Sequence, residues 1–134
     1  MASRKRTTRG FTLIEMMIVI SMILILVSIA IPVYTSSILR AKEGVLKQDL
    51  YTMRQLISQY TLDKQKAPQS LDDLISAGYL KQLPNDPFTG HNDTWTVDQE
   101  DYALSVDQQD TGGIKDVHSG STAISSEGTA YSTW

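Results

Sequence analysis

The sequence predicts an α+β protein in which one long N-terminal α-helix, with a transmembrane half and an amphipathic half, packs on a small antiparallel β-sheet head. Three features support this prediction. Residues 11–31 form an apolar run, apolar residues recur at helical spacing across residues 46–60, and short strand-like segments follow from residue 95 onward. The predicted parts are a basic leader (1–10), a transmembrane and assembly helix (11–33) and one globular domain (34–134).

The N-terminus joins a basic leader to the apolar run. Within residues 11–31 the only ionisable residue is Glu15, and roughly 20 residues of helix are enough to cross the ~30 Å hydrocarbon core of a bilayer. The basic residues of the leader are Arg4, Lys5, Arg6 and Arg9. Because basic residues stay preferentially on the cytoplasmic side, we expect one membrane pass with the N-terminus inside and the globular domain exported.

Glu15 is the unusual residue of this run. A carboxylate in an apolar helix costs about 2.5–3.5 kcal/mol near the bilayer centre and less near the interface, so it normally has a partner or a function. No Lys, Arg or His occurs between Phe11 and Arg40. A cut between Gly10 and Phe11 would create an α-amino group about one helical turn from Glu15, able to pair within the chain or with a neighbouring chain. The alternative is an uncleaved signal anchor, which has no use for Glu15.

These residues resemble a known family. The sequence Gly10-Phe11-Thr12-Leu13-Ile14-Glu15, followed by an apolar helix and Pro32, is similar to the N-terminus of the type IV pilin and type II secretion pseudopilin superfamily. The resemblance implies leader cleavage by prepilin peptidase after Gly10, methylation of the new N-terminal Phe11, and pairing of Glu15 with the N-terminal amine of an adjacent subunit. Pro32 removes a helical hydrogen bond, so we expect a helix kink or local melting around it.

The second half of the long helix is predicted to be amphipathic. Its apolar residues are Leu46, Leu50, Met53, Ile57 and Tyr60, separated by four, three, four and three positions. This spacing places them on one face, which we expect to pack on the core of the head. A short helix is predicted next, with Ser70 and Asp73 as a start similar to a capping box and Gly78 just beyond its end.

A second resemblance covers the middle of the chain. Ala67-Pro68, Gly78-Tyr79-Leu80 and Leu83-Pro84-Asn85-Asp86-Pro87-Phe88 are similar to the G-type major pseudopilins of type II secretion. The sequence departs from that family at Ala67, where an aromatic residue is usual, and at Phe88-Thr89-Gly90, where Trp and Gly are usual. These departures leave open a relative that serves a different substrate or machine.

Two strands are predicted in the C-terminal part. Residues 95–97 and residues 102–106 have strand-like composition, and residues 98–101 would connect them as a hairpin. After residue 106 the chain is polar and rich in glycine, with apolar residues such as Ile114 and Val117 expected to pin it to the sheet. Tyr131 and Trp134 are expected to anchor the C-terminus, and a partly flexible tail is the alternative.

Calcium is the one ligand that the resemblance suggests. The G-type pseudopilins hold Ca²⁺ in a loop near the C-terminus, and the corresponding candidates here are Asp107, Asp110 and Asp116. Carboxylate oxygens in a flexible loop suit this cation. The family's usual serine-x-Gly-x-Asp-Gly run is absent, and the alternative is that these residues are solvated loop acids. His91 and His118 lack the close spacing of a metal motif and are expected to be exposed or satisfied.

The composition narrows the function further. The chain has 12 Lys+Arg and 15 Asp+Glu, a net charge of −3 that becomes −7 without the leader, which does not suggest a nucleic-acid partner. There is no cysteine and no recognisable arrangement of nucleophile and base, so we expect a protein that is not an enzyme. In an exported domain, the absence of cysteine means that the core or a metal provides the stability that disulfides often supply.

The resemblance implies a structural subunit of a periplasmic pseudopilus. Such a subunit is a single-pass protein of the inner membrane with its head in the periplasm, and it polymerises through its N-terminal helix to drive protein export by type II secretion. Its expected partners are other copies of itself, prepilin peptidase, minor pseudopilins and the inner-membrane assembly platform. The alternatives are a type IV pilin or minor pilin of a surface fibre and, in another class, a signal-anchored periplasmic binding module.

Overall fold

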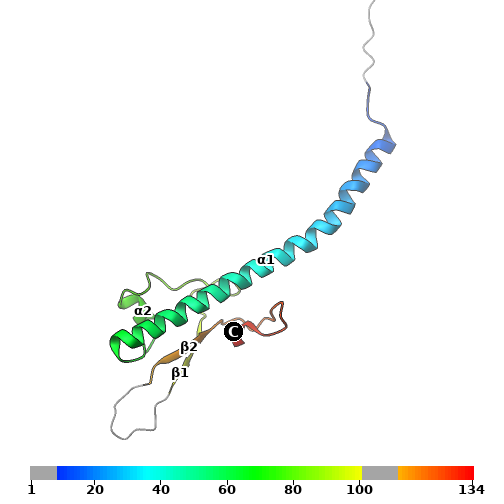
Figure 1. Cartoon of the computed structure of the whole chain (residues 1–134). Helices are drawn as coiled ribbons and strands as arrows, with labels where there is room; N and C mark the ends of the chain where they lie inside the picture. The colour runs from blue at the N-terminus through cyan, green and yellow to red at the C-terminus, as the bar shows by residue number, and fades with distance from the viewer. Residues whose placement is uncertain (1–8, 101–111) are drawn as a thin grey trace, which may run out of the picture. The chain divides into compact units, whose positions relative to one another are not determined.

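The computed structural model describes residues 9–100 and 112–134 (Figure 1). Its elements are α1 (Leu13–Lys64), α2 (Asp72–Ser76), β1 (Thr96–Gln99), β2 (Ile114–His118) and the short 3-10 helix η1 (Tyr131–Thr133). The chain divides into two compact units, Met1–Ile38 and Leu39–Trp134, which are described in turn. A long N-terminal helix and a two-stranded antiparallel sheet confirm the predicted α+β class.

The first unit contains the apolar part of α1. This helix is long and apolar enough to cross a membrane, and none of the side chains in its most apolar stretch is buried within the chain. The polar side chains in it are satisfied locally, since the hydroxyls of Ser21 and Ser28 donate to the carbonyl oxygens of Met17 and Ile25, each at 2.7 Å. Because no polar group other than Glu15 needs water, this stretch suits an apolar surrounding.

The helix continues through Pro32. Residues 29–33 are helical, so the local melting expected there is absent from the described chain, while the kink remains a prediction. Two hydroxyls near the proline donate to helix carbonyl oxygens, Thr35 to Pro32 at 3.1 Å and Ser37 to Val33 at 2.9 Å. The carbonyl group to which Pro32 cannot donate is that of Ser28, so the two hydroxyl bonds lie next to that position but do not replace the missing bond.

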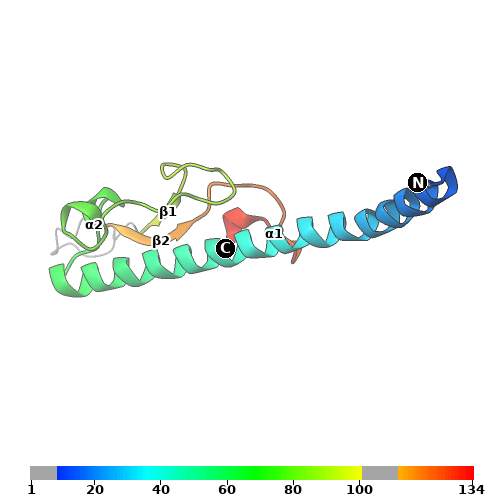
Figure 2. The same cartoon turned by 90° about the horizontal axis from the view of Figure 1, so that it is seen from above.

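The second unit is built on the amphipathic part of α1. The predicted stripe from Leu46 to Tyr60 is confirmed, because each of its five members is at most 8% exposed. In Figure 2 α2, β1 and β2 lie along one side of the green part of this helix. The stripe joins one core with Leu71, Leu74, Trp95, Ile114, Val117 and Tyr131. The anchoring role expected of Tyr131 is therefore confirmed.

The sheet differs from the predicted hairpin. Strand β1 extends to Gln99, so Asp98 belongs to the strand and not to a connection. In the described part of the chain its partner is β2, with Val97 opposite Val117 and an irregularity after Asp98. The predicted strand at residues 102–106 lies outside the described residues. Strand β2 was not predicted from the sequence, because its two buried residues, Ile114 and Val117, are three positions apart and do not show the usual alternation.

The short helix α2 begins differently from the prediction. It starts at Asp72, and no side-chain bond caps its N-terminus, so Ser70 is not its N-cap. One half of the predicted capping box is nevertheless present, because the Asp73 carboxylate accepts the backbone N–H of Ser70 at 3.2 Å, and it also accepts that of Gln69 at 2.7 Å. The predicted end is confirmed, because Gly78 follows the helix with a φ of +85°, a conformation that favours glycine.

Candidate assembly site

The predicted cleavage site lies in exposed, non-helical chain. Gly10 and Phe11 precede the first residue of α1, and the Phe11 side chain is 77% exposed. Thr12 defines the start of the helix, because its hydroxyl oxygen accepts the backbone N–H of Glu15 at 3.2 Å. This bond is the N-cap interaction of a Thr-x-x-Glu capping box. The spacing of Thr12 and Glu15 in the sequence already indicates a helix start at this position.

Glu15 lies in the first turn of α1 and is exposed. Within residues 9–100 and 112–134 no cation lies against its carboxylate. The N-terminal end of a helix favours a negative charge by about 0.3–1 kcal/mol, which is less than the cost of placing that charge in an apolar surrounding. The arrangement therefore offers an unpaired carboxylate, one helical turn from residue 11, to a positive group from elsewhere.

The large side chains around Glu15, from residue 11 to residue 33, are apolar and exposed. All large apolar side chains of residues 11–33 are at least 40% exposed. Exposed apolar area of this extent is unfavourable in water and needs lipid or other helices to cover it. The exposed set begins with Phe11, Leu13, Ile14, Met16 and Met17 and continues to Val33.

In the head, Glu43 of α1 binds the C-terminal residues. Its side chain is buried, and its two carboxylate oxygens accept Ser126 N at 2.7 Å, Ser126 Oγ at 2.6 Å and Tyr131 Oη at 2.8 Å. The bonds from Ser126 lower the pKa of Glu43, although burial opposes them. Burial, together with the bond to Glu43, raises the pKa of Tyr131 to about 12.

Two cations of α1 bind other residues of the C-terminal part of the chain. Lys47 Nζ lies 2.8 Å from a Glu127 carboxylate oxygen and 4.5 Å from the centre of the Trp134 ring. Arg54 pairs with the Asp116 carboxylate and donates to the main-chain oxygen of Trp134 at 2.8 Å. Burial raises the pKa of Asp116, but the hydrogen bonds that it accepts, led by that of Arg54, outweigh burial and lower it overall.

Asp86, which belongs to the proline-rich turn, is fully buried. Its carboxylate accepts the backbone N–H of Phe88 at 2.8 Å and the hydroxyl of Ser119. The Phe88 ring then stacks on Tyr131, with 3.8 Å between ring centres. Asp86 therefore holds the turn and connects it to the C-terminal residues.

The candidate calcium ligands are not brought together in the described structure. Asp107 and Asp110 lie outside the described residues, and Asp116 is paired with Arg54. Within residues 9–100 and 112–134 no group of three acidic or histidine side chains could hold a metal ion. His118 is satisfied as expected, with one ring nitrogen 3.2 Å from Asp98.

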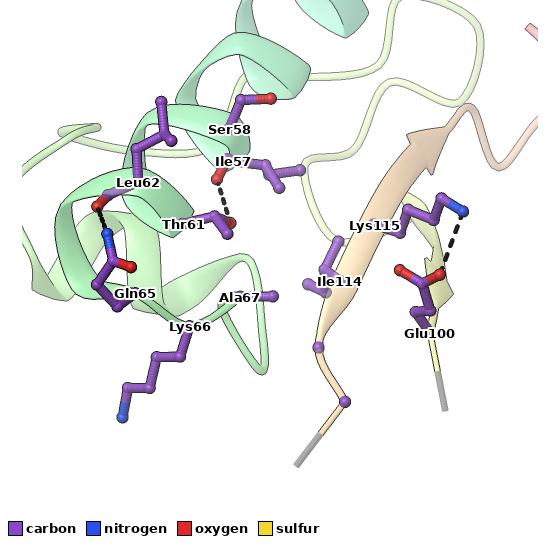
Figure 3. Close-up of a pocket in the computed structure, with 12 residues that line it drawn as sticks. Ile57, Ser58, Thr61, Leu62, Gln65, Lys66, Ala67, Glu100, Ile114 and Lys115 are labelled. Atoms are coloured by element: carbon purple, nitrogen blue, oxygen red, sulfur yellow. Dashed lines mark hydrogen bonds and ion pairs between the residues drawn. The ribbon is translucent and has the colours of Figure 1, made fainter. Parts of the chain in front are cut away.

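A hollow of about 480 Å³ in the head lies between the end of α1 and the start of β2 (Figure 3). Several of its polar side chains are already paired: Thr61 with the Ile57 carbonyl oxygen at 2.8 Å, Gln65 with that of Leu62 at 2.7 Å, and Lys115 with Glu100 at 3.4 Å. Lys66 is a single further cation in the lining. Such a lining lacks the convergent free groups that mark an active site, so we assign no chemistry to this hollow.

Sequence reasoning missed the polar residues that hold the head together. Glu43, Lys47 and Arg54 looked like ordinary solvated residues beside the apolar stripe, and Asp86 like an ordinary turn residue. The available signal was spacing, since four and seven positions separate the three charged residues and place them along one edge of α1. What they bind could not be read from the sequence, because their partners lie more than 60 positions away.

Comparison with known proteins supports the N-terminal reading first. Residues 5–31 match the family model of the prokaryotic N-terminal methylation motif. The chain is 31% identical to type II secretion system core protein G of Aeromonas hydrophila, over 63% of this chain and 71% of that protein. It is 33% identical to the protein of the same name from Pseudomonas aeruginosa, again over 63% and 71%.

A fimbrial protein is also similar. The chain is 35% identical to type IV major fimbrial protein FimA of Dichelobacter nodosus, over 65% of this chain and 58% of that protein. No solved structure matches the chain.

Proposed function

Because the chain belongs to the family of type II secretion system core protein G, we propose that it is the structural subunit of a periplasmic pseudopilus that drives protein export. The subunit is not an enzyme. It polymerises through the apolar part of α1, so that these helices form the centre of the fibre and the heads form its surface. Leaving the bilayer exposes the apolar helix unless sister helices cover it, and extraction is therefore coupled to assembly.

The observation that carries this proposal is that the Glu15 carboxylate, in the apolar part of α1, has no cation against it within residues 9–100 and 112–134. Cleavage after Gly10 supplies the missing cation as the α-amino group of Phe11, which stays positively charged after one methylation. The amine of one subunit then neutralises Glu15 of its neighbour. This pairing favours one axial register, because a shifted helix leaves both charges in an apolar surrounding.

The topology and partners follow from the same proposal. The basic leader holds the N-terminus in the cytoplasm, the helix crosses the inner membrane once, and the head folds in the periplasm. Prepilin peptidase removes the leader. Minor pseudopilins and an inner-membrane assembly platform then act with copies of this chain.

A type IV pilus subunit is the second candidate, favoured by the similarity to the Dichelobacter fimbrial protein. It shares cleavage and assembly and differs in producing a fibre at the cell surface. A signal-anchored binding module would keep its leader and would not polymerise. The site of the fibre and the processing of the chain therefore separate the three possibilities.

The decisive experiment replaces Glu15 by alanine in cells with active prepilin peptidase. We expect Glu15→Ala to insert and to be cut before Phe11 and methylated, as judged by mass and N-terminal sequence, but to form no fibres in microscopy or pull-down. Ser21→Ala is the matched control, since it removes a polar group that the helix already satisfies, and it should assemble. Normal fibres from Glu15→Ala would contradict the proposed pairing, and a wild-type chain that keeps its leader would favour the anchored module.

We also propose that Asp107 and Asp110, which precede β2 in the sequence, contribute to a calcium site. Carboxylates of this kind are the hard ligands that Ca²⁺ prefers. Asp116 would join them only by exchanging its Arg54 partner for the cation.

A further inference from the structure

Three charged residues on one edge of α1 hold the C-terminal segment, residues 116–134. We call Glu43, Lys47 and Arg54 the polar ridge. Glu43 binds residues 126 and 131 of the segment, and Lys47 binds residues 127 and 134. Arg54 binds residues 116 and 117 and shares residue 134 with Lys47. The ridge therefore contacts this segment at both of its ends and in its middle.

The charges of the segment are neutralised by the ridge. Its two acidic side chains, Asp116 and Glu127, face Arg54 and Lys47 respectively. In the opposite direction, Glu43 receives its hydrogen bonds from Ser126 and Tyr131, which are neutral groups of the segment. In the described part of the segment no carboxylate is left without a partner from α1.

The buried member of the ridge is unsuited to a cation. Three N–H or O–H groups point at the Glu43 carboxylate, and their hydrogens occupy the positions that a metal ion would take. Lys47, one turn further along α1, adds a positive charge that favours the ionised carboxylate and repels a second cation. The donor set is therefore that of a satisfied carboxylate and not that of a metal ligand.

We propose that the polar ridge closes the C-terminal segment onto α1 and that this closure needs no metal ion. Closure then depends on the charge of Glu43 and not on the calcium concentration outside the cytoplasm. The proposed calcium ligands Asp107 and Asp110 precede β2 in the sequence and are not members of the ridge.

The test measures hydrogen exchange by mass spectrometry on the full chain in detergent micelles, once with EDTA and once with calcium chloride. In the wild type, peptides from residues 119–134 should exchange at the same rate in both buffers. Glu43→Gln keeps the shape of the side chain but removes the charge, and because bonds to charged groups are the stronger ones we expect these peptides to exchange about tenfold faster or more in both buffers. Asp72→Asn, which removes an exposed carboxylate of α2, is the control and should match the wild type.

Two milder variants keep the test decisive if Glu43→Gln does not fold. Ser126→Ala removes one hydroxyl donor to Glu43, and Tyr131→Phe removes the other. Both should speed the exchange of the segment with no dependence on calcium. The proposal is overturned if calcium slows exchange of residues 119–134 in the wild type. It is also overturned if Glu43→Gln, or both milder variants, exchange as slowly as the control.

Discussion

Replacing Asp86 tests whether one buried carboxylate organises the head. The side chain is fully buried and accepts the Phe88 N–H at 2.8 Å and the Ser119 hydroxyl. Asp86→Ala removes both acceptors and supplies nothing in their place. Asp86→Asn keeps the shape and one oxygen, so the bond to Phe88 can persist while the amide nitrogen faces Ser119.

The structure gives the size of the expected effect. Each buried donor left without an acceptor costs about 1–3 kcal/mol, so Asp86→Ala should destabilise the head by about 3–4 kcal/mol. For a domain of roughly 100 residues, 1 kcal/mol corresponds to about 4–8 °C, which predicts a fall in Tm of roughly 12–32 °C. Asp86→Asn should cost about 1 kcal/mol, because it loses the charge but leaves fewer groups unpaired.

Tryptophan fluorescence is the assay, since Trp95 is buried in the core of the head and reports its unfolding independently of the membrane helix. Thermal or urea unfolding is recorded on the full chain in detergent micelles. Asp72→Asn serves as the surface control and should change stability by less than about 0.5 kcal/mol. A Tm for Asp86→Ala within 3 °C of the control would show that water satisfies Phe88 and Ser119, and would refute the reasoning from burial.

Two further predictions concern ions and pH. If Asp107 and Asp110 bind calcium, EDTA should lower the Tm of the wild-type chain in micelles, and an unchanged Tm would remove both from consideration. Because the folded state lowers the pKa of Glu43 and Asp116, their stabilisation is fully present above their unfolded values, 4.5 and 3.8, and is lost as the pH falls below them. Acid unfolding followed by fluorescence should therefore lie at a higher pH in Glu43→Gln than in Asp72→Asn.

The long helix could be predicted because its signals are local. The apolar run and the stripe from Leu46 to Tyr60 depend only on the order of residues along one element, and a single period describes each. Strand β2 could not be predicted in this way. It is short, begins next to Gly113 and contains a shift in the pairing register between Ile114 and Asp116, so alternation between its two buried residues is lost.

The candidate site divides along the same line. Gly10, Phe11 and Glu15 form a motif within six consecutive residues, so the sequence alone is enough to predict their roles, which stay predictions. Asp86 and the polar ridge depend on partners far along the chain. A charged residue beside an apolar stripe looks the same whether it faces water or a distant segment, and only the fold distinguishes the two cases.

Glu15 and Glu43 lie on the same helix, but only Glu43 finds hydrogen-bond partners within the described part of its own chain. Glu43 is buried by its own chain, and Ser126 and Tyr131 give it every hydrogen bond that it requires. Glu15 has no such partner among the described residues, and its surroundings are apolar. A carboxylate that folding leaves unpaired in an apolar surface is stabilised most by a cation delivered together with more apolar surface. In the proposed fibre, the amine-bearing helix of a second copy would supply both at once, so the unpaired Glu15 would itself favour polymerisation.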